Sequence, residues 1–171
     1  DGASNDNTEE VVLSYNDPKI KYIKLDCKGP EVQMRKAFSV SSGEYIAFLD
    51  DDDEYLPQKI EKQVNFFDSL PIDVGLIYCW MSYYNNSEPD KCIHVHAPKY
   101  RGHIGDIQAA YYPVSGTPML MVRRNVLAKV GGGYDDSCGY IGSDKELVTR
   151  VFEENKISAV IHFAGLKAVG E

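Results

Sequence analysis

Hydrophobic and polar positions alternate with two different periods along this chain. Three segments have the pattern of strands, namely KIKYIKL (19–25), EYIAFLD (44–50) and VGLIYCWMSYY (74–84). Between them, residues 30–43 and 58–70 place apolar side chains at helical spacing. Because alternating strands and helices pack as layers, the pattern predicts an α/β fold with a largely parallel sheet.

The second half of the chain continues this alternation. A short strand near Met119–Val122 precedes a helix that starts at Asn125. The helix DKELVTRVFEEN (144–155) precedes a last strand, ISAVIHFAG (157–165), and the polar loop DGASNDNT (1–8) leads into a first helix. With 171 residues, and with neither an internal repeat nor a low-complexity linker, the chain is expected to form one domain.

Charge and cysteine content narrow the classes of function. A net charge of −8 argues against binding to nucleic acid or to an anionic membrane surface. The four cysteines form no CxxC pair, which predicts reduced thiols in a cytosolic protein. In CIHVH, strand alternation would place Cys92, His94 and His96 on one face; this arrangement could hold zinc, and two histidines alternating on an exposed strand explain the pattern as well.

The segment FLDDDDEYLP (48–57) gathers four consecutive aspartates at the end of a predicted buried strand. Two carboxylates about 4 Å apart repel by roughly 1 kcal/mol even in water. One interpretation is that a divalent cation sits among them and binds a diphosphate, since Mg²⁺ and Mn²⁺ prefer oxygen ligands. The other is a solvated acidic loop that caps the helix after Pro57.

The stretch SGEYIAFLDDDDEYLPQKIEKQ resembles the corresponding part of family 2 glycosyltransferases. The resemblance implies a GT-A-like fold and a metal-dependent, inverting transfer of sugar from a UDP-sugar to a saccharide or lipid-linked acceptor, with Mn²⁺ or Mg²⁺ as cofactor. Asp50, Asp51 and Asp52 match the DXD motif of that family. Asp50 would face the ribose and sugar and Asp52 would bind the metal together with Asp50, while Asp53 would support them.

Other motifs of the family follow in the expected order. Asp1 in DGASNDNT matches the aspartate that contacts the uracil or ribose, and Arg35 matches an arginine on the nucleotide side, although Lys36 replaces the asparagine that usually follows it. GTPMLMVRRNVLAKVGGGYDDS resembles the acceptor-side strand and helix of the family. Asp144 matches the catalytic base, with Ser143 where glutamate is common; without the resemblance, Asp144 would be interpreted as a helix N-cap.

The resemblance covers residues 1–150, which we expect to form a GT-A-like domain that lacks the first strands of the family. Residues 151–171 resemble part of UDP-galactose 4-epimerase, with Lys167 near the cofactor of that family, and are expected to pack on the same domain as a helix–strand tail. An epimerase would also need a glycine-rich dinucleotide turn, which the sequence lacks. The alternative to an active transferase is a truncated or chimeric fragment without catalysis.

Partners and location follow from the same interpretation. We expect a cytoplasmic enzyme of polysaccharide biosynthesis, or one attached peripherally at the inner face of the membrane. A second copy of the chain could complete the sheet, because exposed strand edges recruit partners. The tyrosines could offer apolar faces to a sugar or belong to the core and rim; they are Tyr83, Tyr84, Tyr111 and Tyr112.

Overall fold

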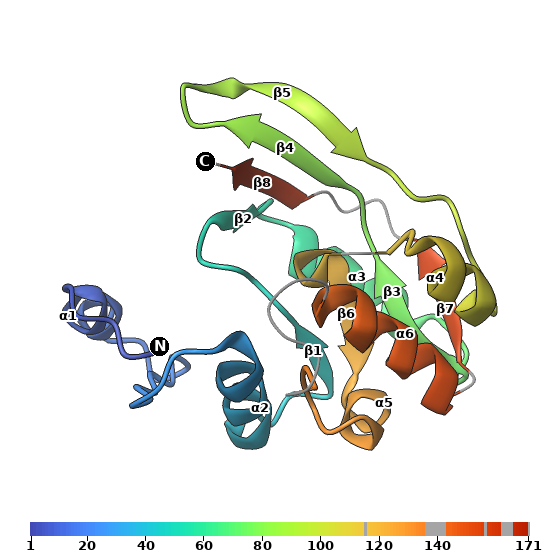
Figure 1. Cartoon of the computed structure of the whole chain (residues 1–171), viewed down its shortest axis with the longest axis horizontal. Helices are drawn as coiled ribbons and strands as arrows, with labels where there is room; N and C mark the ends of the chain where they lie inside the picture. Colours follow the sequence, from blue (N-terminus) through green and yellow to red (C-terminus); the bar gives the residue numbers. More distant parts are fainter. Residues whose placement is uncertain (115, 136–142, 156, 162–165, 171) are drawn as a thin grey trace.

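The computed structural model describes residues 1–114, 116–135, 143–155, 157–161 and 166–170 (Figure 1). Within these residues the strands form two four-stranded sheets. The central sheet has the order β1 (Tyr45–Ala47), β6 (Leu120–Arg123), β3 (Val74–Tyr78), β7 (Ser158–Ile161). The second sheet has the order β2 (Asp53–Tyr55), β8 (Leu166–Gly170), β4 (Met81–Asn85), β5 (Glu88–His96).

The α/β fold is confirmed, but the prediction of a largely parallel sheet is wrong. In the central sheet β6 runs antiparallel to both β1 and β3, and only β3 and β7 are parallel among the described pairs. The second sheet is also mixed, because β8 runs parallel to β4 and antiparallel to β2. Apolar periodicity reports which residues are buried and carries no information on strand direction, so the sequence could not show this.

The predicted strand over residues 19–25 is also wrong. Residues 18 and 19 form a turn, residues 20–24 have no regular secondary structure, and among the described residues the segment makes one isolated parallel bridge, between Gly2 and Leu25. The backbone N–H of Leu25 donates to the carbonyl of Asp1 at 2.9 Å. An alternating pattern alone does not make a strand, because a strand also needs a hydrogen-bonding partner along its length. At the other end of the chain, the structure adds strand β8 after the strand predicted to be the last.

Helices flank the central sheet, except for the first helix of the chain, which lies apart from it (Figure 1). Within the described residues they are α1 (Thr8–Ser14), α2 (Pro30–Val40), α3 (Lys59–Asp68), α4 (Gly105–Tyr111), α5 (Arg124–Lys129) and α6 (Ser143–Asn155), with a 3-10 turn η1 (Thr117–Met119) before β6. Helix α2 begins at Pro30, whose fixed φ suits the first helical position. The predicted domain boundary between residues 150 and 151 lies inside α6, and β7 from the tail belongs to the central sheet.

The core lies on both faces of strand β3, which is buried throughout. Leu76 and Tyr78 join the larger cluster, which includes Leu147 and Val151 of α6. Val74 and Ile77 belong to a second cluster with Phe67 of α3 and Met121 of β6. Leu76 and Ile77 are successive residues that point to opposite faces, so α6 and α3 lie on opposite sides of the sheet. Val74 shares the face of Ile77 because the strand register shifts between Val74 and Leu76.

Candidate functional site

Five predicted site residues line one open cleft with a volume of about 840 Å³. Asp1 comes from the N-terminal loop, Asp50, Asp51 and Asp52 from the connection between β1 and β2, and Asp144 from the first turn of α6. These segments are far apart in the sequence, so the fold itself brings the carboxylates together. The cleft is therefore the candidate active site.

The aspartate segment forms a tight turn rather than a long loop. The N–H of Asp53 donates to the carbonyl of Asp50 at 3.2 Å, and the chain then enters strand β2, which pairs with β8. Behind the turn, the hydroxyl of Tyr55 donates to the carbonyl of Phe48. The turn and this contact hold Asp50, Asp51 and Asp52 at the wall of the cleft.

Two carboxyl groups of the turn have perturbed acidities. The pKa of Asp50 is raised to about 6, first because the surrounding protein partly desolvates it and then because of the negative charge of Asp144. Part of Asp50 nevertheless stays open to the cleft. Partial burial, followed by the charge of Asp52, likewise raises the pKa of Asp53 to about 6. Both groups are less stable as anions here than in water, and a bound cation would reverse that preference.

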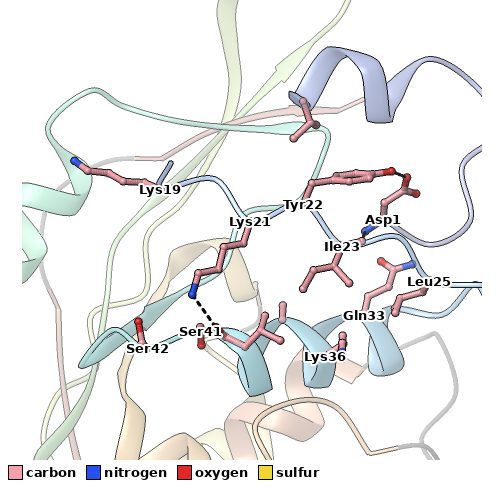
Figure 2. Close-up of a pocket in the computed structure, with 13 residues that line it drawn as sticks. Asp1, Lys19, Lys21, Tyr22, Ile23, Leu25, Gln33, Lys36, Ser41 and Ser42 are labelled. Carbon is pink, nitrogen blue, oxygen red and sulfur yellow. Dashed lines mark hydrogen bonds between the residues drawn. The ribbon is translucent and has the colours of Figure 1, made fainter. Parts of the chain in front are cut away.

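Asp1 is held at the junction between the acidic cleft and a second cavity of about 490 Å³ (Figure 2). The N–H of Ser4 donates to its Oδ1 at 2.9 Å, and the hydroxyl of Tyr22 donates to its Oδ2. The second cavity is lined by Lys19 and Lys21, which precede α2, and by residues of α2 itself. Lys21 donates from Nζ to the carbonyl of Val40 at 3.2 Å. The bonds from Ser4 and Tyr22 fix the orientation of the Asp1 carboxylate.

Asp144 is held by residues that precede α6 in the chain. The hydroxyl of Tyr134 donates to Oδ1 of Asp144, and the Oγ1 of Thr117 lies 3.2 Å from the same hydroxyl. Burial, and then the bond to Asp144, raises the pKa of Tyr134 above its ordinary value, so Tyr134 stays a hydrogen-bond donor at neutral pH.

Arg35 does not join the residues that line the acidic cleft. Its backbone and Cγ lie instead against Gly133, close to the turn that follows α5. Conversely, the sequence analysis did not single out Tyr134, Lys28 or Gln33, which all line the cleft. The run GGGY was a signal for Tyr134, because a glycine cluster lets a neighbouring element approach closely.

The four candidate tyrosines lie away from this cleft. Tyr83 packs its ring against His94 across the β4–β5 pair, with centroids 5.7 Å apart. Tyr111 and Tyr112, at the end of α4, are exposed, and neither they nor Tyr83 and Tyr84 line the cleft. Their predicted role toward a sugar stays untested.

Within the described residues the cleft offers carboxylates but no preformed metal cage. In the part of the chain that the structure describes, no three histidine, cysteine, aspartate or glutamate side chains come close enough to hold one ion. Cys92, His94 and His96 therefore do not form such a group. Nε2 of His96 instead lies 2.9 Å from the carbonyl oxygen of Pro113. A pair of aspartates still suits Mg²⁺ or Mn²⁺, because these ions commonly bind one or two carboxylates and complete their shell with water and substrate phosphates.

Two further expectations can be compared with the described residues. Cys27, Cys79 and Cys92 are free thiols, and Cys138 lies outside the described residues. Among the described helices, none combines the length and the apolar character needed to cross a bilayer.

Known proteins resemble this chain both in sequence and in structure. An uncharacterized glycosyltransferase of Rickettsia conorii is 31% identical over 162 residues, which cover 86% of this chain and 26% of that protein. The Escherichia coli UDP-Glc:α-D-GlcNAc-diphosphoundecaprenol β-1,3-glucosyltransferase WfaP is 32% identical over 85 residues, which cover 49% of this chain and 32% of that protein. The chain thus spans between about a quarter and a third of the length of these relatives.

Solved structures share the fold. Staphylococcus aureus TarS 1–349 in complex with UDP-GlcNAc has a TM-score of 0.73 at 17% identity; the match covers 100% of this chain, including the tail, and 48% of the TarS 1–349 chain. The mannosyltransferase PcManGT of Pyrobaculum calidifontis, solved with GDP-Man and Mn²⁺, has a TM-score of 0.65 at 14% identity, with 98% of this chain and 45% of that one covered. These likenesses confirm the predicted GT-A-like fold.

A sequence model of one protein family matches more than half of this chain and shows which family it belongs to. The model described as glycosyl transferase family 2 matches residues 1–131, which contain the N-terminal loop, α2 and the aspartate turn. The resemblance of residues 151–171 to an epimerase lies beyond this match and stays a prediction. The chain belongs to glycosyl transferase family 2.

Proposed function

We propose that this chain carries the donor site and the catalytic base of a UDP-sugar-dependent inverting glycosyltransferase. One observation carries the proposal: carboxylates from three separate segments, Asp1, Asp50–Asp52 and Asp144, line a single cleft. The names of similar proteins support a UDP-sugar donor, since TarS was solved with UDP-GlcNAc and WfaP is named for UDP-Glc. WfaP is also named for a diphosphoundecaprenol acceptor, which supports a lipid-linked saccharide as acceptor here.

In the proposed reaction the acceptor oxygen attacks C1 of the donor sugar while the bond from C1 to the diphosphate breaks. The leaving UDP takes the electron pair of that bond. Asp144 accepts the proton of the acceptor hydroxyl, so that no covalent enzyme intermediate is needed and the configuration at C1 inverts. Asp1 would hold the nucleoside end of the donor.

Asp50 and Asp52 would hold the divalent cation. When bound, the cation offsets the negative charge that grows on the departing diphosphate. The raised pKa of Asp50 supports this assignment. Partial desolvation and the neighbouring carboxylates destabilise its anion, and a bound cation would offset that repulsion. Lys28, which also lines the cleft, is an additional candidate for contact with phosphate.

A domain that binds a cation but transfers no sugar is the second candidate. The position of Arg35 favours it: this residue, predicted for the nucleotide side, has its backbone and Cγ against Gly133 and does not line the cleft. In that case Mn²⁺ would bind without promoting the binding of UDP.

Titration calorimetry with UDP, in the presence and absence of Mn²⁺, separates the two candidates. We expect binding of UDP that requires Mn²⁺ and weakens at least about tenfold in Asp52→Ala, because a lost carboxylate ligand weakens the bridge to the diphosphate. Asp90→Ala, an exposed aspartate of β5, is the matched control and should bind like the wild type. Equal UDP affinity in Asp52→Ala and the wild type would refute the proposed donor site.

A further inference from the structure

Tyr134 contacts the proposed base directly and is itself almost completely buried. Only 6% of Tyr134 is exposed, its hydroxyl donates to Oδ1 of Asp144, and it lines the acidic cleft. We propose that Tyr134 is a positioning residue that fixes the Asp144 carboxylate for proton abstraction. This inference rests on the proposed function and adds to it a residue that acts through the base rather than on the substrate.

The surroundings of Tyr134 leave its hydroxyl little freedom. Thr117, which is fully buried in η1, places Oγ1 3.2 Å from that hydroxyl. The aromatic ring belongs to the main core cluster. Thr117 can donate to the Tyr134 oxygen while Tyr134 donates to Asp144, so the three side chains form one directed chain of hydrogen bonds.

Helix α6 is tied to the same part of the chain at a second point. Arg150 donates through Nη2 to the carbonyl of Gly133 at 2.8 Å and through Nη1 to the carbonyl of Val130. Asp144 and Arg150 therefore both hold α6 against the segment 130–134. With the helix fixed by Arg150, the Tyr134 bond determines the remaining rotation of the Asp144 carboxylate.

The consequence for the reaction is geometric. A carboxylate whose Oδ1 is held by Tyr134 presents Oδ2 to the acceptor hydroxyl. Without the bond, the carboxylate can rotate away from Asp50, whose negative charge lies near enough to interact with it. Misplacement of a reacting group by about 1 Å can lower the rate about a hundredfold, so loss of one hydroxyl should be visible in turnover.

Donor hydrolysis by Tyr134→Phe tests the proposal without knowledge of the acceptor. With UDP-glucose and Mn²⁺, and water in place of the acceptor, we expect kcat to fall between about tenfold and a hundredfold while KM and the Kd of UDP change less than about twofold. Tyr78→Phe is the matched control, since Tyr78 is also a buried core tyrosine. Its hydroxyl donates to the carbonyl of Tyr100 at 2.5 Å, and it does not line the cleft. Its kcat should stay within about twofold of the wild type.

Asp144→Asn distinguishes failure of this inference from failure of the proposed function. If Asp144→Asn loses turnover but Tyr134→Phe keeps the wild-type kcat, the positioning role is wrong and the base assignment stands. If Asp144→Asn keeps the wild-type kcat, the base assignment fails and the inference falls with it.

A spectroscopic measurement decides the matter when hydrolysis is too slow to follow. In chain labelled with 3-fluorotyrosine, the ¹⁹F signal of Tyr134 is the one that disappears in Tyr134→Phe. Asp144→Asn should move this signal and leave that of Tyr78 in place, because a neutral amide replaces the charged hydrogen-bond acceptor. An unmoved Tyr134 signal would show that the two side chains are not coupled and would overturn the proposal.

Discussion

Gly133 lies so close to helix α2 that a β-carbon on it would come within 3.0 Å of Cγ of Arg35. Its neighbour Gly132 has a φ of +80°, and a β-carbon there would come within 2.1 Å of Cδ1 of Phe38. The glycine turn therefore packs directly on α2 and, through Arg150, on α6. Arg35 thus starts against this turn, and it is not among the residues that line the acidic cleft.

Gly132→Ala should destabilise the fold. The substitution combines a left-handed backbone with a clash against the ring of Phe38, and overpacking of this kind costs about 1–3 kcal/mol. Urea unfolding should show a lower midpoint with an unchanged slope. Gly131→Ala is the control, because it has a similar φ of +79° but open space around its β-carbon, so the difference between the two variants measures the contact with Phe38 alone. Equal midpoints would contradict this contact.

Because Lys59 is buried, we expect an unusual dependence of the free energy of unfolding on pH. Its side chain is 1% exposed and donates to Oε1 of Gln63 at 2.9 Å, and burial lowers its pKa to about 8. In the unfolded chain this lysine keeps its proton up to about pH 10.4. Between pH 8 and 9 the folded state therefore binds fewer protons than the unfolded state, and the free energy of unfolding should rise by about 1 kcal/mol from this group.

Comparison with Lys59→Met isolates that contribution. Burial raises the pKa of the nearby Cys79 to about 11, which lowers stability as pH rises through the ordinary range of a thiol. Because the charge of Lys59 itself lowers the pKa of Cys79, both chains carry Cys79→Ala, so that the difference between their free energies of unfolding at pH 8 and at pH 9 reports Lys59 alone. Parallel pH curves for the two chains would mean that Lys59 titrates normally.

Asp50→Asn should raise the thermal stability of the metal-free chain and lower the stabilisation that Mn²⁺ provides. At pH 7 without metal, the variant removes an anion whose pKa is raised to about 6, so its melting temperature should rise. Because Asp50 is partly open to solvent, the gain should not exceed about 1 kcal/mol, or about 2–4 °C. With Mn²⁺ at about a hundred times its Kd, the wild type should gain about 2.7 kcal/mol from binding, and the variant should lose most of that gain. Differential scanning calorimetry measures both, and equal stabilisation by Mn²⁺ would exclude Asp50 as a ligand.

The sequence indicated the candidate site better than it indicated the sheet. Asp1, Asp50–Asp52 and Asp144 were found from motif order, and the fold places them in one cleft. Strand directions were missed because hydrophobic periodicity is the same for parallel and antiparallel neighbours. Tyr134 and the displacement of Arg35 depend on how the glycine turn packs against two helices, a tertiary contact that local spacing does not encode.

Arg123 should be the least replaceable cation of the central sheet. Its side chain donates through Nε to the carbonyl of Val74 at 2.9 Å and lies over the ring of Phe67, with Cζ 4.5 Å from the ring centroid. It thereby connects β6 to the end of α3 and the start of β3. Lysine cannot reproduce these contacts, because it lacks the planar fork of donors, and it would place a compact charge in the core.

Arg123→Lys should therefore lower the free energy of unfolding by about 2–3 kcal/mol, the typical result when buried hydrogen-bonding groups lose their partners. Glu44→Gln separates this effect from ion pairing. The carboxylate of Glu44 lies 3.9 Å from Nη1 of Arg123 but is 76% exposed, so its loss should change stability by less than about 0.5 kcal/mol. A larger effect of Glu44→Gln than of Arg123→Lys in urea unfolding would show that the ion pair, rather than the contacts with Val74 and Phe67, stabilises this part of the sheet.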